Sequence, residues 1–283
     1  MVAMTWPEIL DTARGTAEEY CKDGSVAWFR GHRSADYRLR SALHRHVDDL
    51  VRGWKQPPEG SGLIQLLRDE YKTLYRRFKA DAWPLLDARE RSDWGVIFTM
   101  QHYGLPTRLL DWTENFACAV FFAQWRRRRD QEATLWILDP HALNGIAINN
   151  SGFLALDEDI GESTIPATDW HPKWVAPERN LQSVAVFPIF TNPRMTAQRS
   201  AFTMAGDEFV PLDAEYTNLT ASGRLKRLDL SPSVFDAVNV FLRDAGVNPF
   251  TFFPDLPGLA LRYKAETERR LSEAKLWYPH FIQ

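Results

Sequence analysis

The sequence contains very little cysteine and no long apolar run. Cys21 and Cys118 are the only cysteines among 283 residues, so we expect no disulfide framework and a reducing cytoplasm as the compartment. No stretch approaches the roughly 20 apolar residues that cross a bilayer. Met1–Leu10 lacks the basic and apolar regions of a signal peptide. These absences predict a soluble cytoplasmic protein without a membrane partner.

Metal-ligand patterns and the common catalytic motifs are missing as well. The sequence has no Walker loop, no glycine-rich dinucleotide fingerprint, no GxSxG and no HExxH, which disfavours the commonest hydrolase and Rossmann functions. His44 and His46 would face the same side of a strand, but no third ligand follows at a suitable spacing. Cys118 lies in an apolar run, where we expect a buried thiol rather than a nucleophile. No metal is therefore expected.

Aromatic residues, by contrast, are abundant, with 11 Trp and 17 Phe. They favour a well-packed interior and would suit a pocket that stacks a flat ligand. The formal net charge of -3 gives no general attraction to nucleic acid, although a local basic patch could still bind it.

The pattern of apolar residues predicts mixed helices and strands without regular βαβ alternation, which favours the α+β class. Leu50–Gly62 has the composition of a loop, and Leu143–Pro177 resembles a long excursion without periodicity. We expect helices at Thr5–Tyr20, Leu63–Phe78, Trp94–Tyr103, Asn115–Arg129, Ser231–Ala245 and Tyr263–Lys275, and strands at Val26–Arg30, Glu132–Asp139, Gln182–Phe190 and Ser200–Met204.

Asp111 precedes the helix expected over Asn115–Arg129, and two interpretations of it remain open. It stands three residues before Glu114, as in a capping box, so it could be the helix N-cap, with Thr113 as a competing cap. Alternatively, it belongs to a helix start whose free N–H groups hold a phosphate. The run Arg126–Arg129 is expected to be a solvated helix end, where cations complement the helix dipole.

Arg30 is expected at the end of an apolar strand and is followed at once by Gly31, which permits close approach of backbone or ligand. A guanidinium there is well suited to bind a pyrophosphate or a carboxylate. A structural salt bridge, for example a buried pair with Asp111, is the alternative. The same two interpretations apply to Arg108 in "PTRLLDWT".

The segments "WFRGH", "QHYGLPTRLLDWTENFACAVFFA", "RMTAQRSAFT" and "NPFTFFPDLPGLA" resemble the FRG domain family, known from bacteria and phages and named for the signature that Phe29-Arg30-Gly31 matches here. Ser200 stands where the family has a glycine. The resemblance extends over roughly Val26–Ala260. It implies one domain over residues 1–283 with its core at about 26–260, an N-terminal helix and a C-terminal helical extension.

The order of three motifs is also similar to that of ADP-ribosyltransferases. Phe29-Arg30-Gly31 matches their aromatic-Arg-Gly strand, while Asp111-Trp112-Thr113 and Gln198-Arg199-Ser200 take the places of the Ser-Thr-Ser strand and the Gln-x-Glu turn with different residues. This similarity implies a twisted, largely antiparallel sheet packed by helices. It also implies that Arg30 holds the phosphates of NAD.

The similarity further implies an ADP-ribosyltransferase or NAD glycohydrolase. Gln198 would hydrogen-bond the ribose, and Asp111 or Glu208 would supply the carboxylate that supports an oxocarbenium-like transition state. NAD would be the substrate and a nucleic acid or protein the acceptor, in a toxin or phage-defence effector whose immunity partner, if any, the sequence does not identify. The alternative is a non-catalytic nucleotide- or nucleic-acid-binding module with the same pocket. The remaining candidate cofactor-binding residues are Gly31, His32, His102, Arg108 and Thr113.

Overall fold

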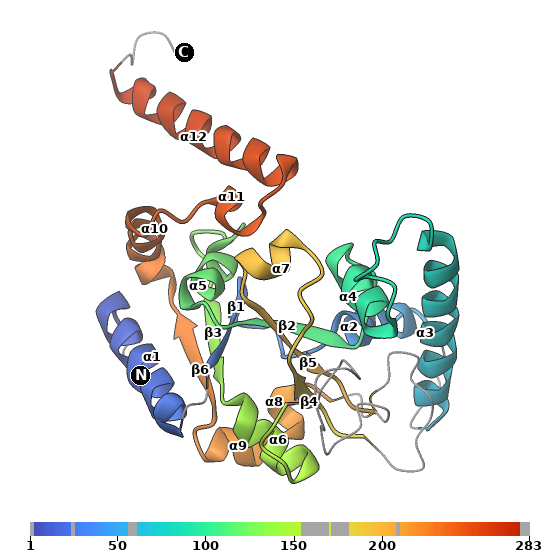
Figure 1. The fold of residues 1–283 in the computed structure, drawn as a ribbon. Helices are drawn as coiled ribbons and strands as arrows, with labels where there is room; N and C mark the ends of the chain where they lie inside the picture. The colour runs from blue at the N-terminus through green and yellow to red at the C-terminus, as the bar shows by residue number, and fades with distance from the viewer. Residues whose placement is uncertain are drawn as a thin grey trace.

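An antiparallel sheet forms the centre of the computed structural model (Figure 1). The structure describes residues 3–23, 26–55, 61–153, 170, 181–207 and 210–277, and in this part six strands pair in the order β4-β5-β2-β1-β3-β6. This arrangement confirms the α+β class and the antiparallel sheet. The strands are β1 (Trp28–His32), β2 (Leu109–Thr113), β3 (Ala133–Leu138), β4 (Val184–Val186), β5 (Ser200–Met204) and β6 (Leu225–Leu230).

Helices pack around the sheet in three apolar clusters. The α-helices are α1 (Trp6–Tyr20), α2 (Ala42–Val51), α3 (Ser61–Ala82), α4 (Asp93–His102), α5 (Phe116–Gln124), α6 (Pro140–Ile148), α7 (Pro193–Ala197), α8 (Leu212–Glu215), α9 (Thr217–Ala221), α10 (Phe235–Asp244), α11 (Pro249–Phe252) and α12 (Leu256–Trp277). Helices α1, α5 and α10 cover one part of the sheet, α6, α8 and α9 another, and α3 and α4 pack against β2, β4 and β5. No helix in the described ranges is long and apolar enough to cross a membrane.

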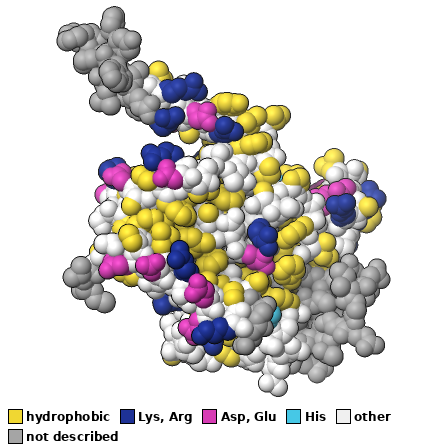
Figure 2. Space-filling view, turned by 60° about the vertical axis from the view of Figure 1, so that its left-hand side comes forward, with side chains coloured by type: hydrophobic (Ala, Val, Ile, Leu, Met, Phe, Trp, Pro, Cys, Tyr) yellow, Lys and Arg dark blue, Asp and Glu magenta, His cyan; other side chains and the backbone are white. Residues whose placement is uncertain are grey.

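Helix α12 stands clear of the sheet and is the last described element of the chain (Figure 1). Its outer surface presents basic, acidic and apolar side chains close together (Figure 2). Leu256, Tyr263 and Leu271 are among the exposed apolar residues of this helix. Helix α12 starts seven residues before the helix expected from Tyr263.

Strands β1 and β2 are neighbours, yet they pair in register only at Phe29 and Thr113. On its other edge β1 pairs along its whole length with β3, and β2 pairs along its whole length with β5. Because the ladder between β1 and β2 is this short, Asp111 has no register partner in the backbone of β1. This interruption at the centre of the sheet is where the candidate site forms.

Helix α5 packs directly on β1, and Gly31 makes this contact possible. A Cβ atom at residue 31 would lie 2.5 Å from the amide nitrogen of Ala123 and closer still to the carbonyl oxygen of Ala119. No side chain can occupy that space without displacing the helix backbone. The close approach expected at Gly31 is therefore made by α5.

Several local predictions are confirmed. Helix α1 begins after Thr5, whose capping box with Glu8 is formed, and β5 has the bounds expected for it. Helices α3 and α4 and strand β3 lie where they were expected, within a few residues at each end. Strand β4, in contrast, covers only three residues of the nine expected over Gln182–Phe190.

Other predictions were wrong. "LLDWT" is strand β2 rather than the start of a helix, and β6 and α2 were not expected at all. Strand β1 continues to His32, so Arg30 lies inside the strand. His44 and His46 lie on α2, where residues two apart do not share a face. Helix α5 ends at Gln124, five residues earlier than expected.

The two expected loops are only partly tested. Helix α2 extends to Val51 and α3 begins at Ser61, so each end of the predicted loop Leu50–Gly62 is helical, and residues 56–60 lie outside the described part. The excursion expected over Leu143–Pro177 begins inside helix α6. Most of its remainder also lies outside the described part.

Candidate functional site

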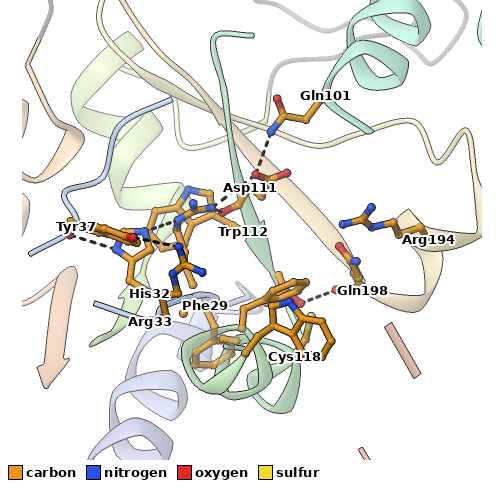
Figure 3. A pocket seen from close by; sticks show the side chains of 16 residues that line it. Phe29, His32, Arg33, Tyr37, Gln101, Asp111, Trp112, Cys118, Arg194 and Gln198 are labelled. Carbon is orange, nitrogen blue, oxygen red and sulfur yellow. Dashed lines mark hydrogen bonds and ion pairs between the residues drawn. The ribbon is translucent and has the colours of Figure 1, made fainter. Parts of the chain in front are cut away.

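A cleft of about 360 Å³ opens beside the interruption between β1 and β2 (Figure 3). Its wall brings together Arg30, Asp111 and Gln198, which come from β1, β2 and the residue after α7. A smaller pocket of about 50 Å³ adjoins it and shares Gln101, Asp111, Arg194 and Gln198 with the cleft. The other residues that line the cleft are Phe29, Gly31, His32, Arg33, Tyr37, Gln101, Trp112, Thr113, Cys118, Ala119, Phe122, Trp125 and Arg194.

Arg30 is held in place by three interactions across the interruption of the sheet. Its Nε donates to Nε2 of His32 at 2.8 Å, and its Nη1 donates to the carbonyl oxygen of Asp111. The same Nη1 lies 3.7 Å from Oδ2 of Asp111, and the Arg30 side chain is only 16% exposed. Burial lowers the pKa of Arg30 to about 10, against the opposing effect of Asp111. Because this pKa still lies above neutrality, Arg30 is a charged and largely buried cation.

His32 orients Arg30 and stays neutral. Since Nε2 accepts from Arg30, the ring proton is assigned to Nδ1, which lies 3.2 Å from the carbonyl oxygen of Tyr37. Burial, together with the neighbouring charge of Arg30, lowers the pKa of His32 to about 3. The imidazole therefore acts as a fixed hydrogen-bond acceptor that aims the guanidinium into the cleft.

Asp111 faces the cleft, and its side chain is 56% exposed. The pair with Arg30 is therefore formed, but the prediction that it is buried was wrong. Gln101 donates from Nε2 to Oδ2 of Asp111 at 2.9 Å, and the hydroxyl of Thr107 donates to Oε1 of Gln101. Thr107 in turn accepts the backbone N–H of Leu109 at 3.1 Å. This chain of donors fixes the Gln101 amide so that its NH₂ group faces the carboxylate.

The capping interpretation of Asp111 is also wrong. Asn115 caps α5, and its Oδ1 accepts from the backbone N–H of Cys118 at 3.3 Å. Asp111 lies inside β2 opposite Phe202 of β5. Its carboxylate is therefore available to the cleft.

Gln198 presents a free acceptor to the cleft, and Thr113 supports it. The hydroxyl of Thr113 donates to the carbonyl oxygen of Gln198 at 2.6 Å. The side-chain Nε2 of Gln198 donates to the carbonyl oxygen of Phe252 at 2.9 Å. No donor to its Oε1 is found among the described residues, so this oxygen can accept from a ligand.

The other predicted site residues have different surroundings. Arg108 is 1% exposed, donates to the carbonyl oxygen of Ala205 and lies 3.9 Å from Asp207. It does not line the cleft, so the structural interpretation holds for this residue. His102 lines only the smaller pocket. Glu208 lies outside the described residues.

The run Arg126–Arg129 lies beyond the end of α5, and it is solvated as expected at every position except Arg127. Arg127 is buried and donates to the carbonyl oxygens of Gln131, Leu230 and Ser231. The other three arginines of the run, Arg126, Arg128 and Arg129, are exposed. Arg127 thus ties the segment after α5 to the end of β6.

Two residues of the site were missed by sequence reasoning, Gln101 and Arg194. Both line the cleft and the smaller pocket. Arg194 begins the segment "RMTAQRSAFT". The resemblance of this segment to the FRG family could have indicated Arg194 as a site residue. Gln101 likewise begins the family segment "QHYGLPTRLLDWTENFACAVFFA", but its role depends on meeting Asp111 across the fold. Figure 3 shows Gln101 above Asp111, and Arg194 beside Gln198.

Within the described ranges, no group of three or more His, Cys, Asp and Glu side chains is placed to hold a metal ion. Burial raises the pKa of the Cys118 thiol to about 12, which keeps it protonated and unreactive. The described lining of the cleft consists mainly of arginine, carboxylate, amide and aromatic side chains.

No curated protein and no solved structure matches this chain, so the similarity to the ADP-ribosyltransferase fold stays a prediction. The model of the FRG domain family does match, over residues 25–132. This range includes Arg30 and Asp111 but not Gln198, and it is shorter than the extent expected from the sequence. The central part of the cleft thus comes from the matched segment, and the chain carries an FRG domain.

Proposed function

We propose that the protein is an NAD-utilising enzyme of the ADP-ribosyltransferase type, which releases nicotinamide and transfers ADP-ribose to an acceptor. One observation carries this proposal: Arg30, Asp111 and Gln198 come from distant parts of the chain and line one cleft. The volume and aromatic lining of the cleft suit a nucleotide. Such an enzyme could serve as a bacterial toxin or in phage defence.

In this proposal Arg30 binds the pyrophosphate of NAD. Its Nη2 has no hydrogen-bond partner in the described part of the chain, whereas Nε and Nη1 are held by His32 and by Asp111. The guanidinium is thus fixed in orientation while one edge stays open. A charge-assisted hydrogen bond from a fixed, largely buried guanidinium to a phosphate is among the stronger polar interactions.

Asp111 and Gln198 would act on the ribose. When the bond from C1′ to nicotinamide breaks, neutral nicotinamide leaves with the bonding electron pair and positive charge develops on the ribose. The carboxylate of Asp111 would stabilise that charge, and Oε1 of Gln198 would accept a hydrogen bond from a ribose hydroxyl. An oxygen or nitrogen of the acceptor then forms the new bond to C1′ and loses its proton.

The test is release of nicotinamide from NAD, measured by chromatography, with DNA, RNA or lysate as acceptor. Asp111→Asn should lower the release rate by about 10²–10³-fold, the usual effect of losing one electrostatic stabiliser, while NAD binding measured by calorimetry persists. Asp244→Asn, at an exposed carboxylate on α10, is the matched control. Absence of release under every condition, or full activity in Asp111→Asn, would refute the enzymatic proposal.

A non-catalytic nucleotide- or nucleic-acid-binding module is the alternative, and the charge of the cleft favours it. Among the described lining residues, Arg30, Arg33 and Arg194 face a single carboxylate, Asp111. A module of this kind would be stabilised by NAD or another nucleotide without consuming it. The melting temperature should then rise with ligand, and Arg30→Ala should remove that rise.

A further inference from the structure

Arg194 is the third arginine that lines the cleft, on the side away from Arg33. Figure 3 shows Arg194 beside Gln198, whereas Arg33, His32 and Tyr37 lie at the opposite end. The Arg194 guanidinium packs over the ring of Phe253, with Cζ 4.5 Å from the ring centroid. This contact orients the side chain and leaves its N–H donors free to bind other groups.

Arg194 has no carboxylate partner among the described residues, unlike Arg199 and Arg227. Arg199 lies 3.0 Å from Glu114, and Arg227 lies 2.7 Å from Asp229. Around Arg194 no carboxylate lies within ion-pair distance in the described part of the chain, although the side chain is half-buried. Burial lowers the pKa of Arg194, while Asp111 and Asp255 act on it in the opposite sense from farther away. A partly desolvated cation that has no anionic partner within the protein favours the binding of an anion from a ligand.

The smaller pocket beside Arg194 has room for such an anion. Its volume is about 50 Å³, and Ser200, His102 and Gln101 add polar groups to its wall. It adjoins the main cleft at Asp111 and Gln198, the two residues that would flank the ribose. A group bound in the smaller pocket would therefore lie next to the reacting carbon and away from the pyrophosphate on Arg30.

Cations and aromatic rings in the cleft and beside Trp125 suggest which kind of molecule carries this anion. Arg33 and Arg126 are exposed, and neither has a carboxylate partner within the described ranges. Arg126 lies over Trp125, with Cζ 5.8 Å from the ring centroid, and Trp125 and Tyr37 line the cleft. Cations interleaved with aromatic rings are typical of single-stranded nucleic-acid binding.

We propose that the smaller pocket is the acceptor subsite, and that Arg194 binds a backbone phosphate of a single-stranded nucleic acid there. The inference rests on the proposed function in taking Asp111 and Gln198 as the residues that flank the ribose. It adds the acceptor class, nucleic acid, and the residue that recognises it.

The experiment measures binding without any reaction. Fluorescence anisotropy with a labelled single-stranded DNA and RNA oligonucleotide gives the affinity of the wild type, Arg194→Gln and Arg243→Gln. Arg243 is an exposed arginine of α10 paired with Asp244, so its substitution controls for the loss of one charge. Calorimetry with NAD alone runs in parallel on the same proteins, and circular dichroism shows that each variant is folded.

Arg194→Gln should weaken oligonucleotide binding by about tenfold and lower the slope of log affinity against log salt by about 0.7. NAD binding and the Arg243→Gln variant should stay unchanged. Equal loss of NAD and oligonucleotide binding would overturn the inference, because Arg194 would then belong to the NAD site. Lack of oligonucleotide binding by the wild type, or Arg194-dependent binding of polyglutamate in its place, would overturn it too. Nicotinamide release tests the proposed function separately, so the two failures can be told apart.

Discussion

Replacing Gly31 with alanine tests whether the signature glycine serves the fold or the ligand. The added Cβ would lie 2.5 Å from the amide nitrogen of Ala123 and 2.9 Å from the carbonyl carbon of Ala119. Both are backbone atoms of α5, so no side-chain rotation can relieve the overlap. Helix α5 would have to move away from β1.

The expected loss of stability follows from that geometry. Overpacking costs about 1–3 kcal/mol when neighbouring side chains can adjust, and here a packed helix has to shift as a unit. We expect a loss of at least about 3 kcal/mol. In a chain of this size, that loss should lower the melting temperature by about 6–12 °C.

Gly15→Ala is the matched control. Gly15 lies inside α1, and a Cβ there would meet nothing within 4 Å. The control should stabilise the protein by about 0.5–1 kcal/mol, since alanine favours the helix over glycine. Calorimetry and urea unfolding followed by circular dichroism measure both variants. If Gly31→Ala melts within about 2 °C of the wild type and loses only nucleotide binding, the glycine serves ligand approach and the reasoning is wrong.

Three further predictions concern acid stability, helix capping and thiol reactivity. Burial lowers the pKa of His32 and of His44 to about 3, whereas a histidine in the unfolded chain has a pKa of about 6.5. Between pH 7 and pH 5 these histidines therefore take up protons only in the unfolded state. Each of them should lower the free energy of unfolding by about 2 kcal/mol over that range. Urea midpoints at the two pH values measure this loss, and His44→Gln should reduce it; a midpoint independent of pH would contradict the burial argument. Asn115→Ala should cost about 1 kcal/mol as a lost N-cap, whereas Asp111→Ala should change the urea midpoint little; the reverse order would restore the capping role of Asp111. Ellman's reagent should label Cys118 only after denaturation, because burial raises its pKa to about 12, and labelling of the native protein, located by peptide mass spectrometry, would show an accessible thiol.

Local features were predictable from the sequence because they depend on residues close together in the chain. The capping box of Thr5 and Glu8 defines the start of α1 within one turn. The short, mostly apolar run Ser200–Met204 is sufficient to indicate a buried strand. Arg30 could be singled out in the same way, because an arginine between apolar residues and a glycine is unusual within a strand.

Strand β2 could not be recognised from its own residues. "LLDWT" has an aspartate at its centre and pairs with residues of β5 far along the chain. Such a segment is a strand because of its partners rather than its propensity. For the same reason Asp111 resembled a helix cap until its neighbours in the sheet were known.

The sequence by itself determined the α+β class, the arginine of the site and the match of residues 25–132 to the FRG domain family. Only the tertiary structure decided that Asp111 faces the cleft, that Gln101 holds it and that Arg194 joins Gln198 opposite Arg33. These relations arise from contacts between segments that are far apart in the sequence. Strands β1 and β2 pair only at Phe29 and Thr113, and no local pattern of residues encodes where two distant strands stop pairing.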